Sequence, residues 1–368
     1  MNVLQVVPEL NAGGVEGTTL EMAEALIAQG HGAHVISAGG RMEDELIRMG
    51  GVLHKADIGS KNLFSIFRRI RLLRAIIHEH KIDIVHARSR APAWPAYHAA
   101  RIEGVPFLTT YHGIYNSRSS LKTYYNSVMA RGEHIIANSE FTKAHIIKTH
   151  GTDAERITAI PRGVDMEKFD PAIISSEDIL AQRNRWNISA EQKVILLPGR
   201  LTRWKGPLVA VQALAKLPED CVLSLMGDAQ GRDDFVSEIN ALTDKLGVKG
   251  RVIMPGHSRD VPTALAAADV VISASTDPEA FGRVAAEAQA MQKPVVATAH
   301  GGALETVLDS KTGFLVTPND AKALAEGIRK ALDWPEYEGP AARSRTASQF
   351  SKKNLQVKTL AVYNDLLK

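Results

Sequence analysis

Short hydrophobic runs alternate with longer segments of helical periodicity along almost the whole chain. In the first half the runs predict buried strands at 3–8, 33–39, 82–87, 106–112, 134–139 and 157–161. In the second half they predict strands at 194–199, 221–227, 251–256, 270–275, 294–299 and 313–318. This alternation is typical of parallel βαβ units. So many buried strands exceed one sheet, and the pattern predicts two sheets of about six strands each.

The break between the two halves lies where the strand pattern stops. Residues 163–193 contain Pro, Ser and many charges but no strand pattern. We therefore predict an N-terminal domain at 1–165, a linker with a lead-in helix at 166–190 and a C-terminal domain at 191–349. The last segment, 350–368, has helical periodicity, which leaves open the domain it packs on. Ligands of open α/β sheets bind beyond the carboxyl ends of the strands, so we expect the site in a cleft between the domains.

The composition is that of a globular protein and excludes several other classes. Of the 368 residues, 45% are hydrophobic and 23% are charged, and the length favours two domains. The net charge of only +3 argues against a dedicated nucleic-acid binder. The single cysteine, Cys221, excludes an internal disulfide framework and indicates a reducing compartment. The start MNVLQVVPEL predicts a buried strand rather than a signal peptide, and no stretch reaches the roughly 18–20 apolar residues that span a bilayer.

Residues 60–81 form a basic segment with hydrophobic residues at helical spacing. Six Lys and Arg residues stand there against a single acid, Glu79. One interpretation is a helix resting on an anionic membrane, where each basic residue contributes about 1 kcal/mol near the surface. The other is a crossover helix packed on the sheet with a basic outer face. The need for a connection to the strand at 82–87 favours the second interpretation, and the two can coexist.

Two glycines, Gly13 and Gly14, follow the first predicted strand and precede a helical segment. Glycines at such a turn let the backbone approach a phosphate, which the N-terminus of the helix also favours. Together with Gly17 they read G-G-x-x-G, which is not the dinucleotide fingerprint, and no acid follows the second strand to bind a ribose. A nicotinamide enzyme is therefore disfavoured, and a tight turn without a ligand stays an alternative.

Two cations, Arg200 and Lys205, follow the first predicted strand of the second half. Across a strand-to-helix turn they can converge on one anion, the arginine as a bidentate fork and the lysine as a mobile charge. A solvated basic loop is the alternative interpretation.

The stretch DPEAFGRVAAEAQAMQKP (277–294) places Glu279 before a helix that is predicted to begin near residues 280–283. The free backbone N–H groups at such a helix start suit a diphosphate. Glu279 could then accept hydrogen bonds from sugar hydroxyls, and Glu287 from a vicinal diol such as ribose. Alternatively, Glu279 caps the helix and Glu287 is a surface acid.

Several motifs taken together resemble the family-4 retaining glycosyltransferases. EAFGRVAAE is similar to the E-x7-E motif of that family, and GRLTRWKG is similar to its G-R-x3-5-K-G segment. The pieces NAGGVE, TYHG, ANSEFTK, IPRGVD, MPGH and GGALETV follow in the family's usual order, so the resemblance covers nearly the whole chain. It implies an α/β GT-B fold with two Rossmann-like domains whose parallel sheets face a central cleft. It also implies that the final helix, 350–368, returns to the N-terminal domain.

The resemblance implies roles for individual residues. Arg200 and Lys205 would neutralise the donor's diphosphate, Glu287 would hold its ribose, and Glu279 would bind hydroxyls of the transferred sugar. His112 would meet that sugar through its side chain, with its main-chain carbonyl near the anomeric carbon. The other implied donor-site residues are Gly13, Gly14, Gly199, Met254, Gly256, His257, Phe281, Gly282, Arg283 and Val284.

Two positions depart from the family's usual pattern. Arg283 stands where many members carry an apolar residue; it could reach a charged acceptor or face solvent, and solvent is slightly favoured. Arg162 stands where Asn is frequent, and its role is similarly open.

For the acceptor, the sequence offers polar loops at strand ends of the first domain. The candidates are Arg88, Arg90, Asn116, Arg118 and Lys122. Such groups could meet phosphate or acidic sugars on a glycolipid, or they could be ordinary solvated loop residues.

The sequence therefore predicts a retaining hexosyltransferase that uses a UDP- or GDP-hexose as substrate and requires neither a metal nor a cofactor. The expected acceptor is a glycan or glycolipid, by analogy with the assembly of lipopolysaccharide core and related surface glycans. The protein is expected in the cytoplasm, with peripheral contact to the inner face of the membrane through residues 60–81 and no nucleic-acid partner. Two alternatives stay open: a GT-B sugar-nucleotide epimerase and a catalytically silent sugar-nucleotide-binding protein.

Overall fold

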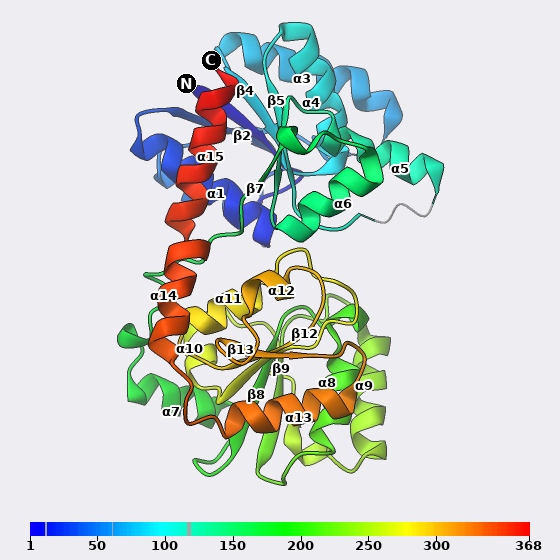
Figure 1. The fold of residues 1–368 in the computed structure, drawn as a ribbon. Helices are drawn as coiled ribbons and strands as arrows, with labels where there is room; N and C mark the ends of the chain where they lie inside the picture. The colour runs from blue at the N-terminus through cyan, green and yellow to red at the C-terminus, as the bar shows by residue number, and fades with distance from the viewer. Residues whose placement is uncertain (12, 61, 116–118) are drawn as a thin grey trace. The chain divides into compact units, whose positions relative to one another are not determined.

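The computed structural model describes residues 1–368 apart from 12, 61 and 116–118 (Figure 1). The chain divides into two compact units. Unit 1 comprises Met1–Gly163 together with Lys352–Lys368, and unit 2 comprises Val164–Ser351. Each unit has its own sheet of parallel strands. None of the described helices combines the length and the hydrophobicity that crossing a bilayer requires.

Unit 1 is built on a seven-stranded parallel sheet in the order β3-β2-β1-β4-β5-β6-β7. The strands are β1 (Asn2–Val6), β2 (Gly32–Ser37), β3 (Val52–Lys55), β4 (Ile84–Ala87), β5 (Phe107–Tyr111), β6 (His134–Ala137) and β7 (Ile157–Ala159). The α-helices are α1 (Gly14–Ala28), α2 (Glu43–Arg48), α3 (Ile66–Glu79), α4 (Arg90–Glu103), α5 (Ser120–Asn126), α6 (Glu140–His150) and α15 (Lys352–Leu366). Leu4 and Val6 pack in the cluster beneath α3 and α4, whereas Val3 and Val7 pack with α1 and α15. Because helices cover both faces, the strands are hydrophobic on both sides.

The last helix, α15, packs beside α1 within unit 1 (Figure 1). Gln356 Nε2 donates a hydrogen bond to the carbonyl oxygen of Glu21 at 2.8 Å, and Lys352 Nζ lies 3.3 Å from a carboxylate oxygen of Glu24. Near the end of the helix, the buried Tyr363 places its hydroxyl 2.7 Å from Nδ1 of His86 on β4. The prediction that the final helix returns to the N-terminal domain is confirmed.

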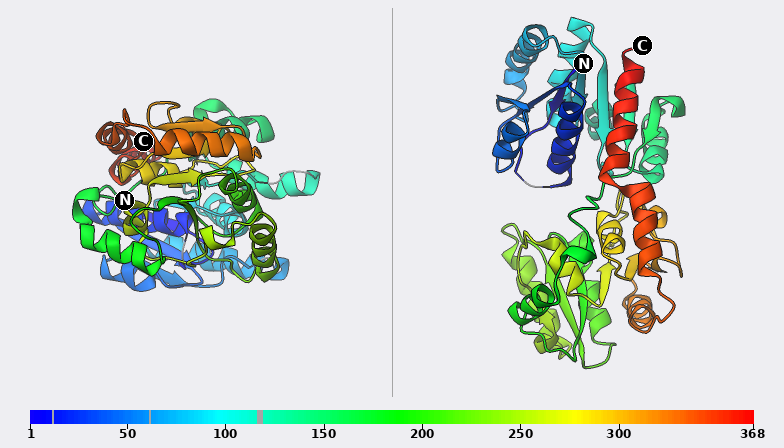
Figure 2. Two further views of the ribbon diagram at one scale, coloured as in Figure 1. Left: turned by 90° about the horizontal axis from the view of Figure 1, so that it is seen from below. Right: turned by 90° about the vertical axis from the view of Figure 1, so that its left-hand side faces the viewer.

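Unit 2 repeats the architecture with a six-stranded parallel sheet in the order β10-β9-β8-β11-β12-β13. The strands are β8 (Lys193–Pro198), β9 (Cys221–Met226), β10 (Val252–Ile253), β11 (Val270–Ser273), β12 (Val295–Thr298) and β13 (Gly313–Val316). The α-helices are α7 (Ser176–Arg185), α8 (Pro207–Leu214), α9 (Asp233–Lys245), α10 (Val261–Ala266), α11 (Arg283–Ala290), α12 (Ala303–Thr306), α13 (Ala321–Leu332) and α14 (Gly339–Phe350). Val194 and Leu196 of β8 pack with α10 and α11, whereas Ile195 and Leu197 pack with α8 and α13. Helices thus lie on both faces of this sheet (Figure 2).

The predicted fold class is confirmed, with one difference in the number of strands. Unit 1 has seven strands in its described part rather than about six, because Val52–Lys55 forms the edge strand β3. Its sequence, VLHK, mixes hydrophobic and polar side chains, and none of them is fully buried. An edge strand with one exposed side lacks the hydrophobic run by which the other strands can be recognised. The predicted lead-in helix is α7, which begins with a capping box between Ser175 and Asp178.

Candidate active site

The loop that carries Lys205 connects β8 to α8 in unit 2. It begins at Gly199, and the 3₁₀ turn Arg203–Lys205 ends at Gly206, whose φ of 75° is left-handed. A Cβ at Gly206 would lie 1.9 Å from the carbonyl oxygen of Ala274, just beyond β11. Only glycine therefore lets this turn approach the end of the neighbouring strand. Pro207 then starts α8, where its missing N–H is not needed.

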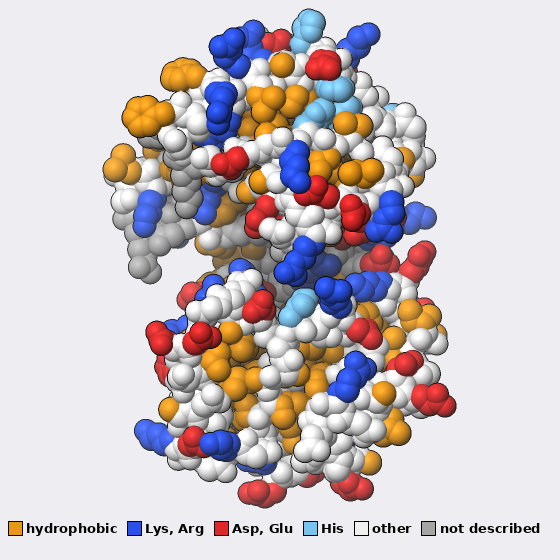
Figure 3. Space-filling view, turned by 180° about the vertical axis from the view of Figure 1, so that it is seen from behind, with side chains coloured by type: hydrophobic (Ala, Val, Ile, Leu, Met, Phe, Trp, Pro, Cys, Tyr) orange, Lys and Arg blue, Asp and Glu red, His pale blue; other side chains and the backbone are white. Residues whose placement is uncertain are grey.

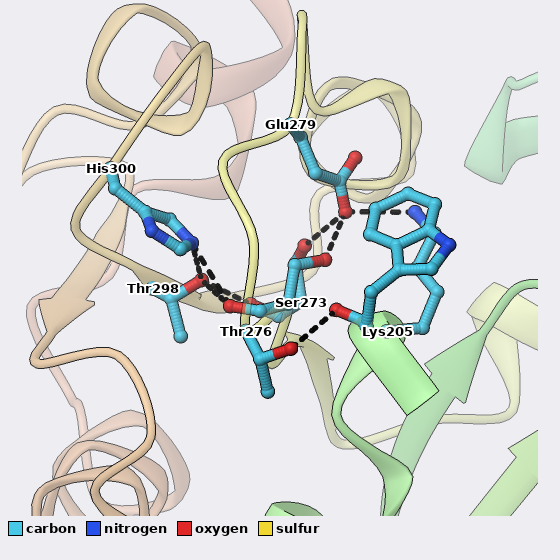
Figure 4. A network of polar contacts seen from close by, with 8 residues as sticks. Lys205, Ser273, Thr276, Glu279, Thr298 and His300 are labelled. Carbon is cyan, nitrogen blue, oxygen red and sulfur yellow. Dashed lines mark hydrogen bonds and ion pairs between the residues drawn. The ribbon is translucent and has the colours of Figure 1, made fainter. Parts of the chain in front are cut away.

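Lys205 and Glu279 form an ion pair at this end of the sheet (Figure 4). Lys205 Nζ lies 2.8 Å from Oε1 of Glu279, and the two side chains are only 16% and 11% exposed. The same Oε1 accepts hydrogen bonds from the hydroxyls of Ser275 and Ser273, the latter at 3.3 Å. Three donors thus hold one oxygen of Glu279, and the other oxygen, Oε2, takes part in none of these contacts.

The surroundings of Glu279 keep it ionised. Burial alone would raise the pKa of its carboxyl group, but the charge of Lys205 and the hydrogen bonds from Lys205, Ser275 and Ser273 outweigh that effect. The pKa of Glu279 is therefore lowered from its ordinary value. Nζ of Lys205 also lies 4.5 Å from the centre of the Trp204 ring, a cation–π contact.

A second layer of contacts fixes the loop around Glu279. Nε2 of His300 lies 2.9 Å from the carbonyl oxygen of Ser275 and 3.1 Å from the hydroxyl of Thr298 (Figure 4). The amide of Gly302 donates to the carbonyl oxygen of Glu279 at 2.7 Å. A Cβ at Gly302 would lie 2.4 Å from the Cα of Phe281, so this turn packs backbone against backbone. The segment that carries Glu279 is therefore held from both sides.

The helix α11 begins at Arg283, within the predicted range of helix starts. Its N-cap is Gly282, with a left-handed φ of 84°. Arg283 does not simply face solvent, as the sequence favoured, because its Nε lies 2.7 Å from Oε1 of Glu287 one turn later. The interpretation of Glu287 as a plain surface acid is also wrong, since its side chain is mostly covered. The side chain of Phe281 is buried and packs edge-on against Phe350.

The remaining candidates in unit 2 lie in loops beyond β8 and β10. Arg200 is exposed, and its side chain makes no hydrogen bond or ion pair with the residues that the structure describes. Met254 is half-buried, Gly256 has a left-handed φ of 78°, and His257 is exposed. Val284 packs against the hydrophobic cluster around α11. The structure thus pairs Lys205 with Glu279 and leaves Arg200 exposed.

In unit 1, Gly13 and Gly14 form the start of α1. Gly13 has φ 148°, and a Cβ there would lie 2.6 Å from Oε2 of Glu16. A Cβ at Gly14 would lie 1.9 Å from Nη1 of Arg162. The absence of a side chain at Gly14 therefore makes room for a guanidinium group that comes from the segment after β7.

His112 follows β5 and lies against the same guanidinium group. Its Nδ1 is 3.3 Å from Nη2 of Arg162, and its carbonyl oxygen accepts a hydrogen bond from Nδ2 of Asn138 at 3.1 Å. Burial, followed by the nearby charges of Arg162 and Arg88, holds the pKa of His112 well below its ordinary value. The imidazole is therefore neutral at physiological pH.

Comparison with known families assigns both units. Residues 12–168 match the family described as Glycosyltransferase Family 4, and residues 178–349 match the Glycosyl transferases group 1 family. A D-inositol 3-phosphate glycosyltransferase of Xylanimonas cellulosilytica is 34% identical over 296 residues, which are 76% of this chain and 71% of that relative. The chain belongs to glycosyltransferase family 4. It spans about half the length of mycobacterial relatives that carry the same name.

Solved structures support the same assignment for this glycosyltransferase. A glycosyltransferase from Rickettsia africae shares 38% sequence identity, with a TM-score of 0.92 over 100% of this chain and 98% of that chain. The HepE protein of Anabaena, in complex with UDP and glucose, shares 26% identity, with a TM-score of 0.87 over 99% of both chains.

The acceptor-side candidates of the glycosyltransferase lie in different surroundings. Arg88 is 2% exposed, and its Nε donates to Oε1 of Gln5 at 2.8 Å, so it is not a solvated loop charge. Arg90 donates to Oδ1 of Asn126 at 2.8 Å and stacks 4.2 Å from the centre of the Tyr115 ring. Lys122 is exposed on α5. The other two candidates, Asn116 and Arg118, lie outside the described residues.

Sequence reasoning did not identify several residues that shape the site of this glycosyltransferase. They are Ser273 and Ser275, which bind Glu279, and His300 with Gly301 and Gly302, which support its loop. A signal existed for the serines, since hydroxyls interrupt the hydrophobic run of VVISAS where that strand ends. The motif GGALETV marked Gly301 and Gly302 as part of the resemblance, but it did not indicate that residues 300–302 would pack against residues 279–281.

Proposed function

We propose that this glycosyltransferase moves a hexose from a nucleotide sugar bound by unit 2 to a hydroxyl group of an acceptor bound by unit 1. The observation that carries the proposal is the buried pair of Lys205 and Glu279 beside the start of α11. A cation for a diphosphate and a carboxylate for sugar hydroxyls are the two groups that a nucleotide sugar requires. The HepE structure with UDP and glucose supports a donor of this class.

The chemistry follows from the charge that develops during transfer. As the glycosyl bond breaks, negative charge gathers on the departing diphosphate and positive charge on the sugar ring. Lys205, Arg200 and backbone N–H groups at the start of α11 would stabilise the diphosphate more in the transition state than in the ground state. Removing one such group typically raises the barrier by about 3–4 kcal/mol. With these cations in place, we propose that the reaction needs no metal ion.

Glu279 is proposed to orient the transferred sugar rather than to attack it. Its Oε1 is occupied by Lys205 and the two serines, which leaves Oε2 to accept hydrogen bonds from sugar hydroxyls. A carboxylate stabilised by so many donors is a weak nucleophile. We therefore propose retention of configuration by displacement on one face of the sugar, without a covalent intermediate. Glu287 would bind the ribose, with Arg283 holding its carboxylate in place.

The acceptor is proposed to be a polyhydroxylated molecule that carries a phosphate group. The curated relatives are named for D-inositol 3-phosphate, which fits this class. A phosphorylated core glycan of a surface glycolipid, the acceptor expected from the sequence, fits it as well. Three of the cations predicted for the acceptor side lie among the described residues of unit 1 and would bind the phosphate group of such a molecule. They are Arg88, Arg90 and Lys122.

We also propose that unit 1 docks on the inner face of the cytoplasmic membrane through α3. Phe64, in the 3₁₀ turn just before this helix, and Phe67, in its first turn, are 95% and 75% exposed. Arg68 and Arg71 are exposed on the same element. Figure 3, which views the molecule from behind, shows hydrophobic side chains protruding beside Lys and Arg over this part of unit 1. Exposed aromatic rings with neighbouring cations suit an anionic bilayer surface.

The donor can be identified with the purified protein. We expect one member of a panel of UDP-, GDP- and ADP-hexoses to raise the melting temperature, because a ligand at 100 times its Kd stabilises the folded state by about 2.7 kcal/mol. Proton NMR of the product formed with that donor and a polyol phosphate should show the donor's anomeric configuration, with and without EDTA. An altered sugar nucleotide in the absence of acceptor would identify an epimerase instead. Donor binding without any turnover would identify a silent binding protein.

A further inference from the structure

Arg162 follows β7 and contacts His112 at two points. Its Nη2 lies 3.3 Å from Nδ1 of the imidazole and 3.4 Å from the carbonyl oxygen of the same residue. One guanidinium nitrogen thus bridges the ring and the main chain of His112. The carbonyl oxygen also accepts a hydrogen bond from Nδ2 of Asn138 at 3.1 Å. Hydrogen-bond donors therefore hold both the side chain and the main chain of this histidine.

The contact with Arg162 determines which nitrogen of His112 carries the proton. Burial is the main reason why the pKa of His112 lies well below its ordinary value, so the ring is neutral at physiological pH. A guanidinium group can only donate hydrogen bonds, and Nδ1 must therefore accept. The single proton of the neutral ring then lies on Nε2. This nitrogen is buried and has no hydrogen-bond partner among the residues that the structure describes.

His112 also lines a small pocket inside unit 1, between the sheet and the helices α1 and α15. The pocket has a volume of about 10 Å³, which is room for about one water molecule. Arg88 and Arg162 line it as well, and Nη2 of Arg88 is likewise buried without a partner in the described part of the chain. One water molecule can accept a hydrogen bond from each of two N–H groups. The pocket thus suits the tautomer that Arg162 imposes on His112.

The position of Arg162 depends on the start of α1. A Cβ at Gly14 would lie 1.9 Å from Nη1 of Arg162, so the guanidinium group fits only beside glycine. Gly14 has no positive φ, so the reason for glycine here is space rather than backbone conformation. Burial raises the pKa of Glu16 in the first turn of the same helix, and the charge of Arg162 acts in the opposite direction. The guanidinium charge therefore has an acid nearby, and what Arg162 offers to His112 is a hydrogen-bond donor.

We propose that Arg162 is a positioning residue for glycosyl transfer, which holds His112 in the Nε2–H tautomer and fixes the direction of its carbonyl oxygen. The inference rests on the proposed function, since His112 is the residue expected to meet the transferred sugar and the anomeric carbon. A polar group that is oriented before the reaction costs no reorganisation during it. Gly14 and Arg162 then work as a pair, which gives a role to an arginine that departs from the usual family pattern.

The test compares the full chain carrying Arg162→Met with the wild type. UDP-, GDP- and ADP-glucose serve as donors and D-inositol 3-phosphate as acceptor. Methionine is also a long side chain but has no N–H group. We expect kcat to fall by about 100-fold, as for a reacting group displaced by roughly 1 Å, and the donor KM to change by less than about twofold. Arg48→Met, which replaces an exposed arginine on α2, is the matched control and should change neither value.

The tautomer itself can be read by long-range proton–nitrogen NMR of selectively labelled histidine. The signal of His112 is assigned by its loss in His112→Gln. The wild type and Lys205→Ala should both show the Nε2–H form, whereas Arg162→Met should show a mixture of the two tautomers. Gly14→Ala keeps the arginine but displaces its Nη1, and it should reproduce both the mixture and the lower kcat. This second variant decides the question if Arg162→Met fails to fold.

The possible results separate this inference from the proposed function. An unchanged Nε2–H signal in Arg162→Met and Gly14→Ala would show that Arg162 does not set the tautomer. A mixed tautomer with the kcat of the wild type would refute the role of Arg162 in transfer and leave the proposed function intact. If the wild type turns over none of the three donors, the proposed function is wrong and the role in transfer falls with it, whereas the NMR signals still report the contact with His112.

Discussion

The two units hold their buried cations with different partners. In unit 2, Lys205 is paired with Glu279 and Arg283 with Glu287. In unit 1, Arg88 is held by Gln5 and lies near the charge of Glu21, and Arg162 lies against His112 and near the charge of Glu16. An anion that reaches Lys205 must therefore compete with a carboxylate in direct contact with it. The difference shows that the same fold can hold a buried cation by a direct ion pair or by neutral polar groups with an acid nearby.

This difference has consequences for stability. A buried ion pair is stable only as a pair, and loss of one partner leaves an uncompensated charge that costs about 3–5 kcal/mol. A buried arginine that is held by neutral groups depends instead on keeping those hydrogen bonds. The stability of unit 2 is therefore expected to depend on intact ion pairs. The stability of unit 1 is expected to depend on the hydrogen bonds of Arg88 with Gln5 and Tyr363.

The largest effect is expected for Lys205→Ala in unit 2. It removes the cation for the departing diphosphate and should lower kcat by about 100- to 1000-fold. It also strands the ionised Glu279, which should lower the melting temperature. Nucleotide release and calorimetry measure the two effects.

The double variant Lys205→Ala with Glu279→Gln is the matched control. It removes both charges and should recover most of the lost stability but none of the activity. Turnover near that of the wild type in Lys205→Ala would remove this residue from the mechanism and weaken the contrast between the units.

The second-largest effect is expected on acidification, which should unfold the two units at different pH values. Burial lowers the pKa of His86 and His112 well below 6.5, and that of His34 to about 4. For a histidine with a lowered folded pKa, the unfolded state binds more protons, so stability is lost as the pH falls below 6.5. For Glu279, whose pKa lies below 4.5, the loss begins only below that value. These histidines all belong to unit 1, which should therefore unfold first.

Hydrogen exchange at a series of pH values, corrected for intrinsic rates, can follow the strands of each unit. Protection of β1 and β4 should fall between about pH 6.5 and 4, while β8 and β11 stay protected. The double variant Lys205→Ala with Glu279→Gln, which leaves no buried charge of this pair, should lack the later, acidic phase of unit 2. Loss of protection in unit 2 before unit 1 would contradict this order.

The sequence predicts features that depend on neighbouring residues, but it does not predict contacts between residues that are far apart in the chain. The strands, the start of α11 and the position of Lys205 and Glu279 at strand ends follow from local patterns, whereas the ion pair between these two residues was not predicted. The pocket of unit 1 does not follow from local patterns either, because Arg88 and Arg162 are far apart in the chain and meet only through the order of the strands. The sequence analysis missed the strand β3 for a different reason. Its four residues mix hydrophobic and polar side chains and form no hydrophobic run.

A third effect concerns the hydroxyl group of Tyr363, which contacts His86 and Arg88. Tyr363→Phe removes a buried hydroxyl that lies 2.7 Å from Nδ1 of His86 and also bonds Arg88. Because both partners stay buried, unit 1 should lose about 1–3 kcal/mol of stability. Tyr337→Phe in unit 2 removes a hydroxyl bond to the carbonyl oxygen of Lys293 and serves as the control. A shift in urea denaturation that is equal in both variants would show that Tyr363 holds no special position.

The smallest effect concerns the exposed cations on α3 of unit 1. Arg71→Gln on α3 should weaken binding to vesicles that contain anionic lipid by about fivefold, since one basic residue near such a surface contributes about 1 kcal/mol. Arg259→Gln, at an exposed position of unit 2, should leave binding unchanged. Raising the salt concentration should abolish the difference, because exposed charges are screened within about 10 Å at 0.1 M. If the wild type shows no preference for anionic over neutral vesicles at low salt, α3 only covers the sheet of unit 1 and does not bind a membrane.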